Sequence, residues 1–271
     1  MNVGRFGGLL ALTLLAGCWP FKGKPKSDAP APVLANSPRT IDSLWLVGQR
    51  AFNRGKWGEA SNVFTRLANA MPVTDARHSR LAFYRGEIDV AQGNELDAVR
   101  QFRRIADENP DDSLAPDALL RAADAYSYLW KRPELDPTYG QTALGVYQEV
   151  LSRYPNSVAA KRAEAKAREL GELFARKEYL SALFYFRYKA DESAVLLLRA
   201  LVVQYPRAKI VPDALEKLVL AYRRLGYQEE VKETCNYIAQ FHAGPNGPSR
   251  YCPPAGAADS VRVQADSIGT R

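Results

Sequence analysis

The chain has 271 residues, of which 46% are hydrophobic, so it is long enough for one large domain or two small ones with buried cores. Lysine and arginine outnumber aspartate and glutamate by 37 to 30, which gives a formal net charge of +7. Because this excess is spread along the chain without a concentrated basic stripe, the composition argues against a nucleic-acid-binding protein.

Residues 1–17 have the pattern of a bacterial lipoprotein signal peptide. Arg5 is the only charge before an almost wholly apolar run over residues 6–16, which is too short to cross a bilayer as a helix. Leu15–Gly17 lead directly into Cys18, which resembles the lipobox at which a signal is cut before a cysteine that is then acylated. We therefore expect a covalent lipid on Cys18 that anchors the chain in a membrane. An ordinary export signal with a chance cysteine is the alternative.

Residues 18–39 are expected to form a tether between this anchor and a folded body. The segment contains the prolines Pro20, Pro25, Pro30, Pro32 and Pro38. Their fixed φ and missing N–H groups discourage both helix and sheet, so an extended spacer is predicted. Trp19, and not Asp, follows the cysteine, which by analogy with enteric lipoproteins favours the outer membrane. The folded body would then face the periplasm.

Long helical patterns punctuated by proline follow, and they contain an internal repeat. Two glycines, an alanine, a phenylalanine and a proline stand at the same offsets in the first two units: Gly48, Gly55, Ala60, Phe64 and Pro72, then Gly86, Gly93, Ala98, Phe102 and Pro110. The pattern resembles the tetratricopeptide repeat (TPR), a helix-turn-helix unit of about 34 residues whose small residues let its helices approach closely. We assign Gly48, Ala60, Gly86 and Ala98 to helix packing.

Three further units follow, with two irregularities. The third unit has about eight extra residues around "WKRPELDPTYG", where Pro133 and Pro137 forbid a continuous helix, so a loop is expected at its turn. The stretch "SVAAKRAEAKARELGELFARK" before the fourth unit is rich in helix formers and predicts an additional exposed helix. Pro116 and Pro212, each followed by Asp, suit the first turn of a helix in the third and fifth units.

The sequence therefore predicts an all-α fold: a TPR superhelix of about five helix-turn-helix units plus an extra helix, between an unstructured tether and tail. Residues 40–155 would hold units one to three, and residues 156–243 the extra helix with units four and five. Residues 244–271 contain Gly, Pro and Ser without a period, so we expect a loosely ordered tail.

No residue pattern points to catalysis. His78 and His242 are the only histidines, and neither has a Ser, Cys or acidic partner at a telling spacing. The sequence has no phosphate-binding glycine loop and no Cys or His pair at metal-ligand spacing. We expect a protein that is not an enzyme and that holds no metal, and no cofactor besides the lipid on Cys18.

Stacked helical pairs curve into a groove that binds peptides, lined mainly by the first helix of each unit. Mapping that TPR pattern onto units one to three selects the candidate peptide-binding residues Trp45, Gln49, Phe52, Arg80, Phe83, Glu87, Leu120, Asp124 and Ser127. The alternative is that Trp45, Phe52 and Phe83 are buried between repeats. Both interpretations stay open here, because a single sequence does not fix the rotation of each helix.

Cys235 in the last helix and Cys252 in the tail form an even pair in an oxidising compartment. This predicts a disulfide that pins the tail to the final repeat. The alternative is that Cys235 is a core residue and Cys252 a free thiol.

The order of features along the chain resembles that of the BamD family of outer-membrane protein assembly factors. These features are a lipobox, a proline tether, five repeats, an insertion in the third repeat and an added helix before the fourth. The most specific part of the resemblance is residues 139–186. The resemblance implies a non-enzymatic outer-membrane lipoprotein of the β-barrel assembly machinery, with the client site in units one to three. Units four and five would dock on the periplasmic domains of the central barrel subunit, and the partners would also include its accessory lipoproteins and unfolded outer-membrane proteins as clients.

Basic residues on the added helix are the candidates for this docking: Lys161, Arg162, Lys166, Arg168, Arg176 and Lys177. A simple solvated helix face is the alternative for them. The sequence departs from the family pattern in its shorter third-unit insertion and its cysteine-bearing tail. A competing interpretation is a lipid-anchored periplasmic TPR scaffold for cell-wall, secretion or division complexes, because a fold does not dictate its partner.

Overall fold

The computed structural model of the chain describes residues 38–72, 74–242 and 251–252. All regular secondary structure in this part is helical. The helices are α1 (Pro38–Asn53), α2 (Trp57–Ala70), α3 (His78–Gln92), α4 (Glu95–Glu108), α5 (Ala115–Leu129), α6 (Thr138–Arg153), α7 (Val158–Arg187), α8 (Asp191–Gln204), α9 (Val211–Leu225) and α10 (Gln228–Phe241). The predicted signal peptide, Cys18 and nearly all of the predicted tether and tail lie outside the described residues.

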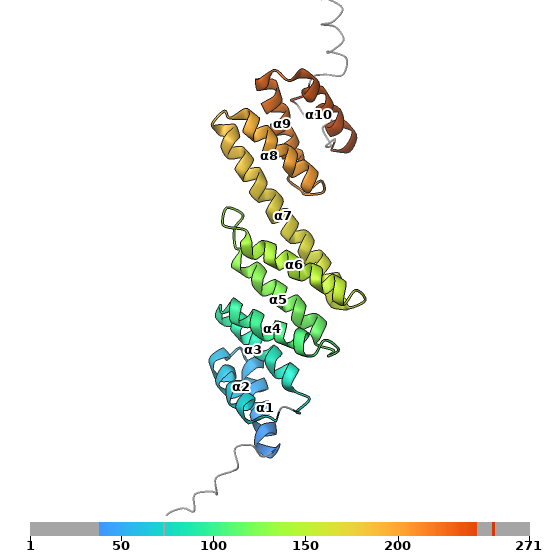
Figure 1. The fold of residues 1–271 in the computed structure, drawn as a ribbon. Coiled ribbons are helices and arrows are strands. Elements are labelled where there is room, and N and C mark those ends of the chain that lie inside the picture. The colour runs from blue at the N-terminus through green and yellow to red at the C-terminus, as the bar shows by residue number, and fades with distance from the viewer. Residues whose placement is uncertain (1–37, 73, 243–250, 253–271) are drawn as a thin grey trace, which may run out of the picture.

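The helices stack in chain order from α1 at one end to α10 at the other (Figure 1). Each helix packs against the one before it and the one after it, and α5 also contacts α7. Five helix pairs, α1/α2 to α9/α10, therefore make up the predicted TPR superhelix, and the all-α fold class is confirmed. None of the described helices combines the length and the apolar character that crossing a bilayer requires.

The buried apolar residues form three clusters along the stack. One lies between α1, α2 and α3 around Phe64, and a second extends from α3 to α7 around Phe102 and Tyr147. The third extends from α7 to α10 around Leu198 and Val219. Each helix pair is thus stabilised mainly by its immediate neighbours, as in other solenoids.

The small residues of the first two repeats let the paired helices touch. A Cβ atom on Gly48 would lie 2.5 Å from Cε1 of Phe64, and one on Gly86 would lie 2.6 Å from Cε1 of Phe102. Ala60 and Ala98, on the second helices of these units, are fully buried. The predicted role of these residues in helix packing is confirmed. The second glycine of each repeat follows the first helix and lets the chain turn away from it. Gly55 and Gly93 have positive φ angles of 69° and 79°, which glycine adopts without strain.

Two predicted boundaries need correction. The first helix begins at Pro38 and not after residue 39, because proline suits the first position of a helix. The predicted extra helix is not a separate element: it continues without a break into the first helix of unit four, and together they form the 30-residue α7. The Oγ atom of Ser157 accepts a hydrogen bond from the N–H of Ala160 at its start, and no proline interrupts it.

Candidate protein-binding surfaces

The groove candidates of unit one belong largely to an aromatic cluster between α1 and α3. Trp45 is 9% exposed, its ring lies edge-on to Tyr84 at 5.9 Å, and the Arg77 guanidinium lies 5.5 Å from the ring centre. Phe52 is half-buried against Tyr84 at 4.8 Å, and Gln49 donates from Nε2 to the Tyr84 hydroxyl over 3.2 Å. Trp45 is therefore a core residue, and its assignment to a groove was wrong.

Unit two supplies the accessible candidates. Arg80 is exposed on α3, whereas Phe83 is half-buried and its ring meets Phe102 at 5.3 Å. In unit three, Leu120 on α5 is 1% exposed and belongs to the central cluster. Leu120 cannot contact a peptide, because the rotation of α5 turns it toward neighbouring helices.

Glu87 and Asp124 are joined by Arg121, a residue that the TPR pattern did not select. Arg121 donates to both oxygens of Glu87 over 2.5 and 2.8 Å and to Oδ2 of Asp124 over 3.0 Å. Asp124 is 6% exposed and its Oδ1 accepts from the Tyr147 hydroxyl over 2.8 Å. Burial, with the Asp124 charge second, raises the pKa of Tyr147 and keeps it a donor. Asp124 therefore belongs to a buried polar network that links α3, α5 and α6, so its groove assignment was wrong.

A small cavity of about 200 Å³ adjoins this network between α5, α6 and α7. Ser127, whose Oγ donates to the Asp124 carbonyl over 2.8 Å, lines it together with Lys166. Tyr128 and Leu173, 44% and 38% exposed, complete an apolar side of the cavity. The structure thus brings a groove candidate and a docking candidate to the same place, at the meeting of units three and four.

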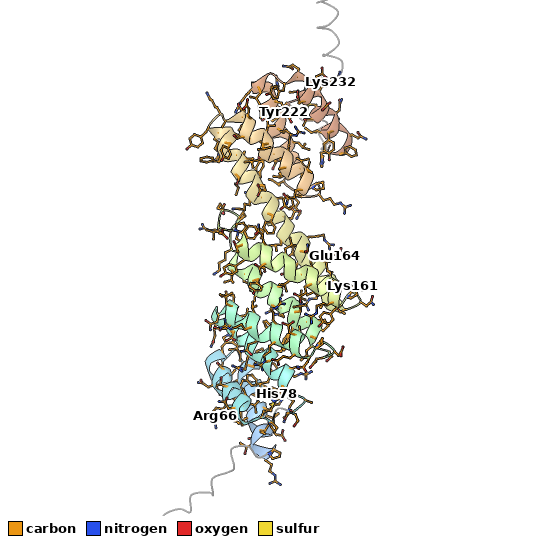
Figure 2. All side chains as sticks on the ribbon, viewed as in Figure 1. Arg66, His78, Lys161, Glu164, Tyr222 and Lys232 are labelled. Carbon is orange, nitrogen blue, oxygen red and sulfur yellow. A yellow bond between two sulfur atoms is a disulfide. The ribbon has the colours of Figure 1, made fainter. Side chains whose placement is uncertain are left out.

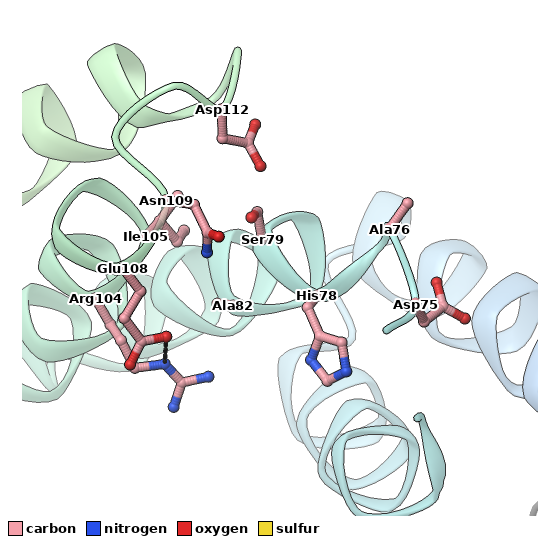
Figure 3. A pocket seen from close by; sticks show the side chains of 10 residues that line it. All are labelled: Asp75, Ala76, His78, Ser79, Ala82, Arg104, Ile105, Glu108, Asn109 and Asp112. Atoms are coloured by element: carbon pink, nitrogen blue, oxygen red, sulfur yellow. Dashed lines mark ion pairs between the residues drawn. The ribbon is translucent and has the colours of Figure 1, made fainter. Parts of the chain in front are cut away.

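A larger cavity, of about 560 Å³, lies between the start of α3 and the end of α4 (Figure 3). None of the predicted groove residues lines it. Its carboxylates already have partners: Glu108 pairs with Arg104 at 3.4 Å, and Asp112 accepts from the N–H of Leu114 at 2.9 Å. Hydrogen bonds from Arg77 lower the pKa of Asp75 to about 2. With its charges compensated in this way, the cavity offers no clear ligand chemistry.

The basic docking candidates lie along α7, and most already have a partner. Arg162 pairs with Asp117 at 3.2 Å, Lys166 with Glu169 at 2.8 Å and Arg168 with Glu164 at 2.7 Å. Lys161, near Glu164 at the N-terminal end of α7 (Figure 2), and Arg176 are exposed. Exposed ion pairs of this kind contribute little to stability, so their charges remain accessible to a partner.

Lys177 is an exception among these candidates. Its Nζ donates to the carbonyl oxygens of Pro133 and Leu135, over 3.3 and 3.0 Å. Both carbonyls belong to the predicted loop between α5 and α6, where Trp130 is 3% exposed and packs on Phe174 at 4.6 Å. Lys177 therefore holds the inserted loop against α7, and its assignment to docking stays a prediction.

Strongly exposed aromatic side chains at the C-terminal end of α7 were missed by the sequence predictions. Phe184, Tyr185 and Tyr188 are 55%, 40% and 73% exposed, and the Phe184 ring lies 5.4 Å from Tyr185 and 4.8 Å from Tyr188. We call these three residues the aromatic end. A cavity of about 480 Å³ adjoins it, lined also by Pro133 and Leu197.

Helix α8, next to the aromatic end, is rich in apolar residues. Its sequence "SAVLLLRALVVQ" is typical of a helix that is buried all round, yet Leu196 is 70% exposed and Val203 is 81% exposed. That composition is the signal by which the sequence alone could have located this surface. Exposed apolar side chains gathered on one part of a protein mark an interaction site.

At the C-terminal end of the stack, Cys235 on α10 is bonded to Cys252. Tyr251 and Cys252 pack against the third apolar cluster, and Arg223 donates to the Tyr251 carbonyl over 3.2 Å. Within the described ranges no group of His, Cys, Asp and Glu side chains is arranged to hold a metal ion. Cys18 lies outside these ranges.

Residues 39–237 match the YfiO family, which is described as "Outer membrane lipoprotein". A protein of Caulobacter vibrioides named "Outer membrane protein assembly factor BamD" is 26% identical over 225 residues, covering 83% of this chain and 71% of the relative. The protein of the same name from Vibrio cholerae is 27% identical over 246 residues, covering 86% and 96%. The TPR2AB domain of yeast Sti1 aligns with a TM-score of 0.42 at 14% identity, covering 75% of this chain and 78% of that one.

Proposed function

The chain belongs to the YfiO family of outer membrane lipoproteins, and on this premise we propose that it is a non-enzymatic subunit of the machinery that assembles outer-membrane proteins. The observation that carries the proposal is the family match over residues 39–237, which extends from α1 into α10. The similarity therefore includes the irregular third and fourth units as well as the generic repeats. Acylation of Cys18 would hold the helical body at the outer membrane, facing the periplasm.

We assign client binding to the first helices of units one to three. Arg80 is exposed there, and Gln49, Phe83 and Ser127 are half-buried, so this face offers three polar side chains and one apolar side chain. The 200 Å³ cavity beside Ser127 adds room for one side chain. Such a surface suits an extended, unfolded segment, which needs both apolar anchors and hydrogen-bonding groups.

Docking on the central barrel subunit is assigned to the aromatic end together with the N-terminal half of α8. Aromatic residues at the centre of a protein interface usually supply most of the binding free energy, whereas paired charges at its rim contribute less. Leu196 and the 480 Å³ cavity extend the surface that a partner domain would cover. Of the basic docking candidates on α7, Arg176 lies nearest this surface, and Lys161, Arg162, Lys166 and Arg168 lie farther along the helix toward its N-terminal end; we call these five residues the basic margin.

Photo-crosslinking in intact cells tests both assignments. A crosslinking amino acid at Tyr188 should capture a barrel protein that carries periplasmic domains, and one at Arg80 should capture unfolded outer-membrane proteins. The same group at Leu96, which is 43% exposed on α4, is the control. Capture of cell-wall, secretion or division proteins at Tyr188 would favour the competing scaffold function and overturn the proposal.

Two variants separate the aromatic end from the basic margin. Phe184→Asp combined with Tyr188→Asp should release the barrel subunit, because it places charge where apolar contact is needed. Arg168→Glu combined with Arg176→Glu should weaken the complex less and make it more sensitive to salt. A complex that survives the aspartate substitutions would remove the aromatic end from the docking surface. Circular dichroism of each variant checks that helix content is unchanged.

A further inference from the structure

A groove at the C-terminal end of the stack lies apart from the aromatic end. It has a volume of about 700 Å³ and is formed by α8, α9 and α10. Leu215, Leu218 and Tyr222 of α9, all at most 5% exposed, form its floor, and Tyr222 is labelled in Figure 2. We call it the C-terminal groove. None of its lining residues belongs to the aromatic end or to the client face.

The two walls of the C-terminal groove differ in chemistry. The α8 wall is mainly apolar, with Val202 and the 81% exposed Val203 beside Arg199. The α10 wall presents Glu230 and Glu233. Neither carboxylate forms an ion pair with any residue in the described part of the chain. The groove therefore combines an apolar floor with two carboxylates on one wall and one guanidinium on the other.

These charges lie close to the apolar floor. Burial is the main reason that the pKa of the Tyr222 hydroxyl is raised. The nearby charges of Glu230 and Glu233 also raise this pKa. Arg199, on the α8 wall, acts on the same hydroxyl and opposes this rise, so one cation faces the two carboxylates across the groove. A cation that entered along α10 would thus meet two carboxylates at the edge of a largely apolar surface.

We propose that the C-terminal groove binds an amphipathic helix of a partner protein, with its apolar side chains on Val203 and the α9 floor and its Lys or Arg side chains on Glu230 and Glu233. Three observations favour this occupant: the groove has two helical walls, its floor is apolar, and its α10 wall carries two carboxylates against a single guanidinium on the α8 wall. The inference goes beyond the proposed function, because it concerns a second partner and a separate surface.

The test uses the full-length lipoprotein in intact cells, with a photo-crosslinking amino acid at Val203 and mass spectrometry of the captured segment. The expected result is a segment with an apolar helical repeat and Lys or Arg along one edge. Glu230→Lys combined with Glu233→Lys should lower its capture about tenfold, since two attractions become repulsions. Glu192→Lys combined with Glu229→Lys is the matched control, because both residues are exposed on α8 and α10 but do not line the groove.

Several outcomes would overturn the proposal. They are capture at Val203 no greater than at Leu96, capture that the Glu230 and Glu233 substitutions leave unchanged, capture of an acidic segment, and capture of residues 253–271 of the same chain. If the double variant does not accumulate, Glu233→Gln alone should still lower capture relative to Glu229→Gln. Crosslinking from Tyr188 in the same variants reports separately on the barrel subunit, so failure of this inference and failure of the proposed function are distinguishable.

Discussion

Replacing Gly86 by alanine is expected to destabilise the protein, although alanine is the better helix former. The new Cβ would lie 2.6, 2.7 and 3.0 Å from three ring atoms of Phe102, whereas carbon atoms in contact are normally about 3.5–4.0 Å apart. Phe102 is 0% exposed, so its ring has no free space into which to move. Overpacking of this kind costs about 1–3 kcal/mol, and helix propensity returns about 1 kcal/mol. With three close contacts we expect a net loss of about 2 kcal/mol.

Gly171→Ala is the matched control. Gly171 also lies inside a helix, but a Cβ there would meet no atom within 4 Å, so only the gain in propensity of about 1 kcal/mol applies. Urea unfolding followed by circular dichroism should therefore place the Gly86→Ala midpoint below the wild type and the Gly171→Ala midpoint above it. In a Phe102→Leu background the alanine at position 86 should cost less. A Gly86→Ala protein as stable as Gly171→Ala would refute close helix approach as the reason for the repeated glycine.

Three further predictions concern stability. Cys235→Ser, which breaks the bond to Cys252 across a sequence separation of 17, should lower the free energy of unfolding by about 3 kcal/mol; equal urea midpoints with and without reductant would contradict this. Arg121→Ala leaves the Glu87 carboxylate without its cation and should lower the free energy of unfolding, measured by thermal unfolding, by about 3 kcal/mol. A loss below about 1 kcal/mol would show that the network contributes little to stability. The pKa of Asp75 is lowered to about 2 in the folded protein, below its unfolded value, so its stabilisation is present above about pH 4 and is lost as the pH falls toward 2. Asp75→Asn should remove that part of the pH dependence of the urea midpoint, and an unaltered pH profile would exclude this role.

The repeat architecture could be predicted from the sequence because steric contacts fix it. Gly48 and Gly86 each face a phenylalanine ring across the helix pair, so their identity and spacing carry the geometry directly. The rotation of each helix is different, since it depends on which neighbours surround it. Trp45 and Leu120 fit a groove pattern by position, yet packing against adjacent units buries both.

The site residues that were missed depend on contacts between distant segments. Arg121 stands in an ordinary helical position, and only the fold brings it to Glu87, 34 residues earlier. Lys177 looked like a free surface charge until the inserted loop offered it two carbonyl oxygens. The exposed apolar residues of α8, by contrast, could have been recognised from the sequence. A helix so rich in apolar residues is normally buried, yet no part of the described chain covers Leu196.

The unbroken α7 has a mechanical consequence for the whole molecule. Its 30 residues rise about 1.5 Å each, so one rod of about 45 Å packs on α5 and α6 along its first half and on α8 along its second. No loop interrupts α7 between the part that packs on α5 and α6 and the part that packs on α8. A twist applied at Phe184 would turn the far end of the same rod, where Lys166 borders the cavity beside Ser127. The proposed client-binding and docking surfaces would therefore move together.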